Sequence, residues 1–311
     1  VQPNVVVVLH NGSPVELPWA DKVSAILEMY LGGQGVGEAC DQLLFGEANP
    51  SGRLAETFPY RLEDNPSYLH FPGNGKRVLY GEDIFVGYRY YDTKKVPVRY
   101  AFGHGLSYTE FAYEDLNLSS AQMTDEDILT VSLKVKNTGK TEGKEVVQLY
   151  VADLCGISER PVKELKGFAK VHLLPGEEKT VSMEILARDL SYYEERLGDW
   201  YAPSGTYRIL IGHASDDIRL HADIVFETQK ELPLRVDFTT TFGELLDHTK
   251  TAPVITELLA PLAAAAASAE GMSDEYKKLG EQVIREMPMK SLLGQMPGEQ
   301  VEQLIGQLNC L

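Results

Sequence analysis

Two adjacent carboxylates, Glu82 and Asp83, are the first candidates for proton chemistry in this sequence. A side-chain carboxyl group can donate or accept a proton during a reaction. Both lie in a stretch from about residue 59 to residue 111 that is rich in glycine, proline, tyrosine and arginine and shows no clear period. Such a stretch is long for an idle loop, so we expect it to wrap over other parts of the molecule or to line a site. The structural alternative is that Glu82 or Asp83 pairs with Arg89 or caps local backbone groups.

A polar loop near the start of the chain is a second candidate. Asn11 and Ser13 follow the apolar run Val5–Leu9, and such a run is typical of a strand buried on both faces of a parallel sheet. Ligands of open α/β sheets gather at the carboxyl ends of the strands. Asn11 and Ser13 therefore either line a binding cleft or form a turn that positions the next element.

Other polar and aromatic residues favour structural roles. The glycines of residues 32–34 are expected to end a helix in a left-handed cap. Trp19 and Tyr30 have rings that could stack against a ligand, but core packing is the expected role. His104 lies between two glycines and is expected to be a structural hydrogen-bonding residue.

The sequence lacks the spacings that hold metals or cofactors. Its seven histidines form no HExxH pair, so no metal is expected. It contains no GxxxxGK[ST] phosphate loop. It also contains no GxSxG elbow and no Cys–His signature, which argues against an esterase or a thiol protease. We expect no cofactor.

The composition excludes several classes of partner. The formal net charge is −17, and an acidic surface repels phosphate backbones, so nucleic acid is not an expected partner. No apolar stretch reaches the roughly 20 residues of a membrane helix, so no membrane is expected. Cys40, Cys155 and Cys310 are too few and too far apart for a disulfide framework. This composition favours a cytoplasmic bacterial protein, with secretion as the alternative.

The first 112 residues are predicted to be a partial α/β layer. After the strand Val5–Leu9, apolar residues at i, i+3, i+4 and i+7 predict a helix over residues 20–30. A second helix is expected over residues 37–45. Strand, helix and helix together indicate a fragment of an α/β sandwich.

The period changes twice after this layer. Over residues 113–228, apolar residues alternate with polar ones and turn signals separate the runs, which predicts an antiparallel β-sandwich. Over residues 229–311 the period is helical, with a stripe from Val301 to Leu308. This tail alone looks too thin for a good core, so we expect it to dock elsewhere. The predicted fold class is multi-domain α/β plus all-β, with boundaries at 1–112, 113–228 and 229–311.

Three segments of the chain carry distinctive motifs. They contain NVVVVLHNGSPVELPW, LGGQ and LFGEANPSGRL (4–54), then VLYGEDIFVGYRYYD and FGHGLSY (78–108), then NTG, VVQLYV and RPVKELKGF (131–168). These segments resemble glycoside hydrolase family 3, the β-glucosidase-like family, and follow one another in the expected order over roughly residues 1–228, on a matching plan of an α/β region and then a sandwich. The third segment resembles the immunoglobulin/fibronectin type III-like domain at the family's C-terminus, and similar helical tails occur in bacterial members.

The resemblance implies a retaining glycosidase, which needs two carboxyl groups about 5–5.5 Å apart. In the family the nucleophile is an Asp of an N-terminal (β/α)8 barrel, and this chain lacks the length and the repeated units of a barrel. The acid/base is usually a Glu on a loop just upstream of the strand equivalent to Val5–Leu9, which places it before Val1. The resemblance therefore transfers neither catalytic residue. Because the acid/base position varies between branches of the family, Glu82 is a candidate acid. The residues expected to contact substrate are Asn11, Ser13, Glu82 and Asp83.

The expected function is the C-terminal part of a retaining β-glycosidase, a β-glucosidase in the first place, that hydrolyses O-glycosidic bonds in small β-glucosides or oligosaccharides. Its partner would be the N-terminal barrel of the same parent chain, and the isolated chain is expected to be inactive. One alternative is a carbohydrate- or protein-binding module without catalysis. The other is a truncated structural remnant.

The first residues carry a further expectation. The chain enters the apolar run Val5–Leu9 almost at once, so we expect Val1 to mark a cut site or the edge of an incomplete record. Missing neighbouring strands would leave an apolar edge exposed. The isolated chain is therefore expected to be poorly soluble or a homo-oligomer.

Overall fold

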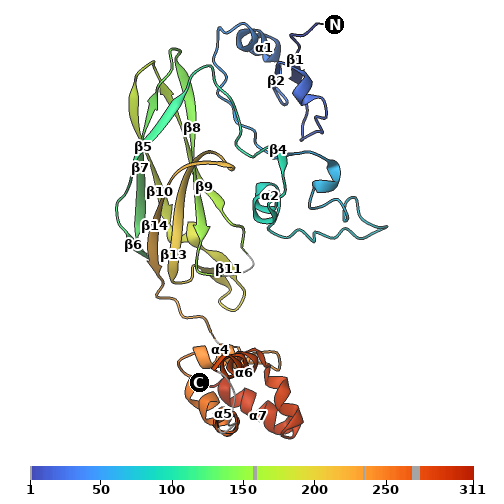
Figure 1. The fold of residues 1–311 in the computed structure, drawn as a ribbon, viewed down its shortest axis with the longest axis vertical. Coiled ribbons are helices and arrows are strands. Elements are labelled where there is room, and N and C mark those ends of the chain that lie inside the picture. The colour runs from blue at the N-terminus through green and yellow to red at the C-terminus, as the bar shows by residue number, and fades with distance from the viewer. Residues whose placement is uncertain (1, 157–159, 234, 268–273) are drawn as a thin grey trace. The chain divides into compact units, whose positions relative to one another are not determined.

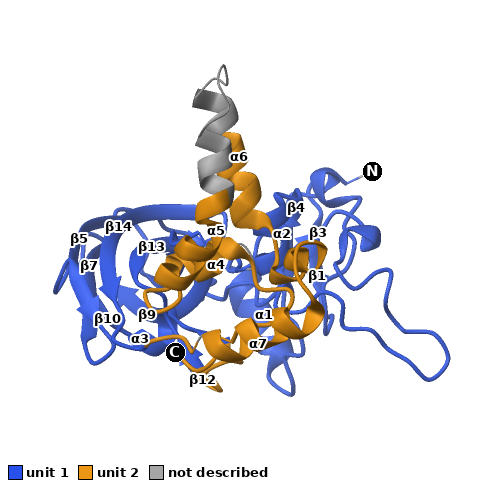
Figure 2. Ribbon diagram, turned by 90° about the horizontal axis from the view of Figure 1, so that it is seen from below, with its two compact units in different colours: residues 1–193, 200–230 blue, residues 194–199, 231–311 orange. Residues whose placement is uncertain are grey.

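A computed structural model of the chain describes residues 2–156, 160–233, 235–267 and 274–311. The chain divides into two compact units (Figure 2). One consists of residues 1–193 and 200–230, and the other of residues 194–199 and 231–311.

The first unit begins with a parallel pair of strands. β1 (Val6–Leu9) pairs in register with β2 (Ala25–Glu28), and a 3₁₀ turn, η1 (Ala20–Lys22), lies between them in the sequence. The helix expected over residues 20–30 is therefore wrong. Its apolar positions fit a helical period, but pairing with β1 satisfies the backbone of this short stretch, and tertiary context overrides so short a local pattern. The second expected helix is confirmed as α1 (Val36–Leu44).

Two small strands and a helix complete this α/β region. β3 (Phe58–Pro59) pairs with β4 (Val98–Tyr100) in antiparallel fashion, and between them lie η2 (Leu62–Asp64) and α2 (Tyr88–Lys94). The core here is small: three buried residues with five partly buried ones around them. They are Leu17, Ala20 and Phe58, with Leu9, Trp19, Ile26, Leu54 and Tyr100.

The rest of the first unit is an antiparallel β-sandwich (Figure 1). One sheet has the order β10-β7-β5 and the other the order β6-β14-β13-β8-β9. The predicted inward positions are confirmed, because Val131, Val147 and Ile209 are fully buried in one core. A short helix α3 (Ala187–Leu190) and the hairpin β11 (Tyr192–Glu194) and β12 (Asp199–Tyr201) follow β10. The main strands are β5 (Phe111–Leu118), β6 (Gln122–Thr124), β7 (Ile128–Asn137), β8 (Gly143–Asp153), β9 (Glu164–Leu173), β10 (Glu178–Leu186), β13 (Gly205–Ala214) and β14 (Asp217–Glu227).

Strand β8 is covered on both faces. Gln148 and Tyr150 point away from the sandwich core, yet both are buried. The Tyr88 ring of α2 lies 6.0 Å from the Tyr150 ring, and Gln148 Nε2 donates to the Gly103 carbonyl at 3.2 Å. The irregular segment of residues 59–111 therefore wraps over the five-stranded sheet. This confirms the expectation that the segment covers another part of the molecule.

The second unit is helical and has its own core. It contains α4 (Phe242–Asp247), α5 (Ala252–Ala267), α6 (Asp274–Glu286), η3 (Met289–Gly294) and α7 (Gly298–Leu308). The expectation that the tail is too thin for a core is wrong, because the segments beside the helices also contribute apolar side chains. The fully buried residues are Val236, Phe242, Leu245, Ile255, Met289, Leu292, Val301 and Leu308. Within the described ranges, no helix is long and apolar enough to cross a membrane.

Candidate functional site

The carboxyl ends of β1 and β2 meet at one edge of the parallel pair. The amide of Met29 donates to the Leu9 carbonyl at 2.9 Å, so the chain leaves both strands side by side. After β1, Asn11 Nδ2 donates to the Ser13 carbonyl at 2.8 Å and closes the loop. A Cβ placed on Gly12 would lie 3.9 Å from Leu31, so the loops that follow β1 and β2 are neighbours. This edge is the place where α/β folds bind ligands.

Glu28, the last residue of β2, contributes a carboxylate to this edge. Its Oε1 accepts the amide of Tyr30 at 2.7 Å. Its Oε2 is buried and has no hydrogen-bond partner among the described residues. Tyr30 has a φ of 48°, an uncommon conformation for a residue other than glycine. A buried acceptor without a donor is rare in folded proteins, and the described residues supply no donor to Oε2.

Glu82 and Asp83 lie on a different segment. Among the described residues, no hydrogen bond or ion pair joins either side chain to Asn11, Ser13 or Arg89. Arg89 instead pairs with Glu164 at 3.4 Å, because the first turn of α2 faces the start of β9. The expected pairing of Glu82 or Asp83 with Arg89 is therefore wrong. Glu82 Oε2 is buried and finds no hydrogen-bond partner in the described part of the chain, and Asp83 is exposed with a φ of 49°.

The remaining candidates hold the structure together. Gly33 has a φ of 67°, but it precedes α1 and follows a strand, so it caps no helix. Trp19 packs against the small core of the α/β region. The His104 ring stacks on the Tyr100 ring with centroids 5.1 Å apart. Burial lowers the pKa of His104, so its imidazole is neutral at pH 7.

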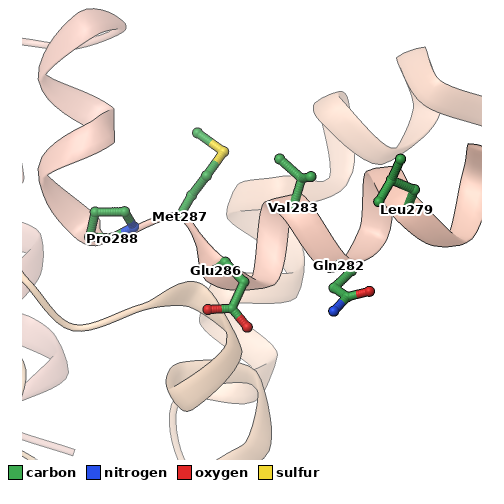
Figure 3. A pocket seen from close by; sticks show the side chains of 6 residues that line it. All are labelled: Leu279, Gln282, Val283, Glu286, Met287 and Pro288. Atoms are coloured by element: carbon green, nitrogen blue, oxygen red, sulfur yellow. The ribbon is translucent and has the colours of Figure 1, made fainter.

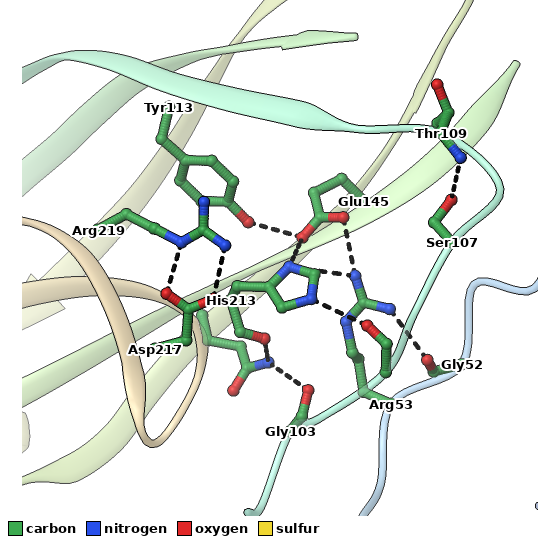
Figure 4. Close-up of polar contacts among 12 residues, drawn as sticks. Gly52, Arg53, Gly103, Ser107, Thr109, Tyr113, Glu145, His213, Asp217 and Arg219 are labelled. Carbon is green, nitrogen blue, oxygen red and sulfur yellow. Dashed lines mark hydrogen bonds and ion pairs between the residues drawn. The ribbon is translucent and has the colours of Figure 1, made fainter. Parts of the chain in front are cut away.

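A buried cluster of charged side chains was missed by the sequence analysis (Figure 4). Glu145 of β8 is 0% exposed, and its Oε2 accepts Arg53 Nη2 at 2.8 Å. Its Oε1 accepts the Tyr113 hydroxyl at 2.7 Å and lies 2.7 Å from His213 Nδ1. Burial alone would raise the pKa of Glu145, but the hydrogen bond from His213 and the charge of Arg53 outweigh it and hold that pKa below its usual value.

This cluster attaches the α/β region to the sandwich. Next to Arg53, the amide of Leu54 donates to the His104 carbonyl at 2.9 Å, and the amide of Gly103 donates to the Leu54 carbonyl at 2.8 Å. The amide of Ser215 in the sandwich donates to the Phe102 carbonyl at 2.9 Å. The Arg53 side chain thus places its positive charge inside the sandwich. The backbone next to Arg53 is hydrogen-bonded to the segment of residues 102–104.

Two surface hollows lie away from these groups. One, on the helical unit, is lined by the side chains of α6 and the two residues after it (Figure 3): Leu279, Gln282, Val283, Glu286, Met287 and Pro288. The other lies within residues 69–79. Neither contains a predicted site residue, and within the part of the chain that is described no three His, Cys, Asp or Glu side chains gather as metal ligands.

Family comparisons agree with this architecture. The glycosyl hydrolase family 3 C-terminal domain matches residues 1–108, and the fibronectin type III-like domain matches residues 145–215. This chain belongs to glycosyl hydrolase family 3. The thermostable beta-glucosidase B of Acetivibrio thermocellus is 46% identical over 313 residues, which cover 99% of this chain, tail included, and 41% of that family 3 protein.

Comparison with solved structures also finds similarity to β-glucosidases. The crystal structure of a beta-glucosidase from Kluyveromyces marxianus in complex with glucose matches with a TM-score of 0.68 and 43% identity, over 72% of this chain and 27% of that one. A GH3 beta-glucosidase from Bifidobacterium adolescentis matches with a TM-score of 0.74 and 39% identity, over 81% of this chain and 37% of that one. The chain thus spans less than half the length of these family 3 relatives.

Proposed function

We propose that this chain acts as the C-terminal part of a β-glucosidase that hydrolyses small β-glucosides with retention of configuration. In this proposal an upstream region supplies both the nucleophile and the acid/base. The names of the relatives support the activity, and the glucose held by the Kluyveromyces marxianus enzyme supports a glycoside substrate. No metal or cofactor enters the reaction, because two carboxyl groups suffice for it.

The observation that carries the proposal is the exposed apolar surface of residues 1–108. Leu69 is 87% exposed, Leu31 81% and Tyr80 79%. Residues 1–108 expose many large apolar side chains of this kind, which is a feature of interaction surfaces. The parallel pair β1–β2 gives the same indication, because Val6 is exposed although parallel strands are normally covered on both faces. An upstream region that packs here would complete both the sheet and the active site.

The contribution of this chain would be one wall of the sugar cleft. Asn11, Ser13 and Glu28 line the edge where β1 and β2 end, and the unpaired Glu28 Oε2 can accept a sugar hydroxyl. Glu82 and Asp83 remain proposed substrate contacts on a second segment.

A chimera tests the proposal. The matching part of the Acetivibrio thermocellus beta-glucosidase would be replaced by this chain, and hydrolysis of 4-nitrophenyl β-D-glucoside would be measured. We expect activity from the chimera and none from the 311-residue chain or the upstream part alone. A chimera with Glu82→Gln is the matched variant, and we expect it to keep most of its turnover because the acid/base lies upstream.

Two results would contradict the proposal. A folded chimera without activity would show that this chain cannot complete the site. Turnover by the isolated chain that disappears in its Glu82→Gln variant would place the acid in this chain. Sugar binding by residues 113–228 alone, without turnover by the chimera, would favour the binding-module alternative.

A further inference from the structure

His213 presents both ring nitrogens to acceptors. Its Nδ1 lies 2.7 Å from Glu145 Oε1, and its Nε2 lies 2.9 Å from the Gly105 carbonyl oxygen. A carbonyl oxygen can only accept, and so can an ionised carboxylate. The two contacts therefore each need a hydrogen on the imidazole.

Two other placements of the protons on His213 and Glu145 are inconsistent with the contacts around them. A neutral His213 with a bare Nδ1 would accept from Arg53 Nη2, but that contact is 3.5 Å, beyond the normal range for such a bond. A protonated Glu145 could donate to Nδ1, but Glu145 already accepts from Arg53 and from Tyr113. The pKa of Glu145 is also held low, so its carboxyl group stays ionised.

The charges around the ring are nearly balanced without it. The carboxylates that face the cluster are Glu145 of β8, Asp217 of β14 and Asp216 in the turn before it. The cationic groups are Arg53, Arg219 and Lys170 of β9, whose ammonium group is close enough to Arg53 to be repelled by it. The assignment of the imidazolium therefore rests on the two short contacts of its ring. His104 and Tyr113 add no charge, because burial lowers the pKa of His104 and raises that of Tyr113.

We propose that His213 is a pH-sensitive latch, which holds residues 52–54 and 102–105 on the β-sandwich when its imidazole carries two protons and loosens them when it loses one. The lost proton would leave a ring nitrogen facing an oxygen without a hydrogen between them. Because the attached form requires the proton, the contribution of the latch falls as pH rises and the ring becomes neutral. Glu145 stays charged throughout, since its pKa is lowered.

The latch reaches the edge where β1 and β2 end. Two residues after Arg53, the amide of Ala55 donates to the Tyr30 hydroxyl at 3.3 Å. The amide of Tyr30 in turn donates to Glu28. Loosening of residues 52–55 would therefore release one support of the Tyr30 ring. This chain alone carries the latch, so the inference does not depend on the proposed function.

Nuclear magnetic resonance of the ¹⁵N-labelled 311-residue chain tests the latch. At about pH 6 we expect both ring nitrogens of His213 to carry hydrogen, and at about pH 9 only one. Over the same change, hydrogen-exchange protection of the Leu54, Gly103 and Ser215 amides, corrected for the intrinsic rate, should fall by about tenfold. The Ser215 amide reports directly on the attachment to the sandwich, because it donates to the Phe102 carbonyl. The Leu54 and Gly103 amides report on the pairing of the two attached segments with each other.

Two variants separate the latch from general effects of pH. In His213→Gln, protection of the three amides should be low at both pH values and independent of pH. In His221→Gln, which removes an exposed histidine of β14, the wild-type response should remain. A singly protonated His213 at about pH 6 with the three amides protected would overturn the proposal. An equal loss of protection in wild type and His213→Gln would also overturn it. The ring protonation is read on the unaltered protein, so the test stands even where the variant folds poorly.

Discussion

The α/β region of residues 1–108 and the β-sandwich that follows it are stabilised in different ways. The sandwich buries a continuous apolar core from both of its sheets. The main cluster of the α/β region buries only three apolar side chains, and many others in the region are exposed. A region with so small a core must rely on neighbours for its stability. One neighbour is the sandwich, and under the proposed function the upstream region would be another.

Several polar contacts join the two regions. The Glu145 cluster forms one attachment, and α2 forms another, where Lys163 pairs with Asp92 at 2.7 Å and the amide of Leu165 donates to the Tyr88 hydroxyl at 2.8 Å. Such contacts fix geometry through directed bonds. We infer that the sandwich serves as a rigid support that positions the less stable α/β region.

The largest effect is expected at the junction. Glu145→Gln keeps the shape of the side chain but removes its charge, which leaves Arg53, only 7% exposed, without its counter-ion. Breaking a buried pair in this way costs about 3–5 kcal/mol. Urea denaturation followed by circular dichroism would measure the free energy of unfolding. Glu184→Gln, the same change at an exposed position of β10, should shift it by less than about 0.5 kcal/mol.

A loss at Glu145 as small as that at Glu184 would mean that the cluster contributes little to the attachment. The two regions would then be held together by the contacts of α2.

The next comparison uses one leucine from each region. Leu149 of β8 is fully buried, and Leu149→Ala should lower the free energy of unfolding by about 2–5 kcal/mol. Leu69 is largely exposed, and Leu69→Ala should change it by less than about 0.5 kcal/mol. The same urea experiment measures both. Similar losses at the two positions would show that the surface around Leu69 is covered in solution, for instance by self-association.

The sequence predicted the sandwich well because its strands follow a strict alternation. The same rule, extended by one step, would have found the buried cluster. Glu145 continues the inward series of Val147, Leu149 and Val151, and His213 continues that of Tyr207, Ile209 and Ile211. A carboxylate and a histidine at inward positions need partners, and each is the other's partner.

The α/β region was harder to predict because local patterns there are short and contacts are distant. Residues 20–30 satisfy a helical period, yet four of them pair with β1. Arg89 lies close to Glu82 and Asp83 in the sequence but pairs with Glu164, which lies in another domain of the fold. The sequence did not indicate Glu28 as a site residue, because Glu28 ends an apolar run that predicts a helix. On such a helix the Glu28 side chain would face solvent. In each case a tertiary contact decided the outcome.

The smallest effect on stability, but a clear effect on association, is expected when the exposed surface is made polar. Leu69 and Phe71 are both largely exposed, so Leu69→Ser with Phe71→Ser should leave the free energy of unfolding within about 0.5 kcal/mol of wild type. Sedimentation velocity over a range of concentrations should show that the wild-type chain associates and that the double variant associates less, because an apolar patch drives contact between copies. Ile128→Ser is the matched control, since Ile128 is an exposed apolar residue at the start of a sandwich strand. An equal reduction by Ile128→Ser would show that association does not arise from the α/β region, and the contrast between the two regions would then be one of core size alone.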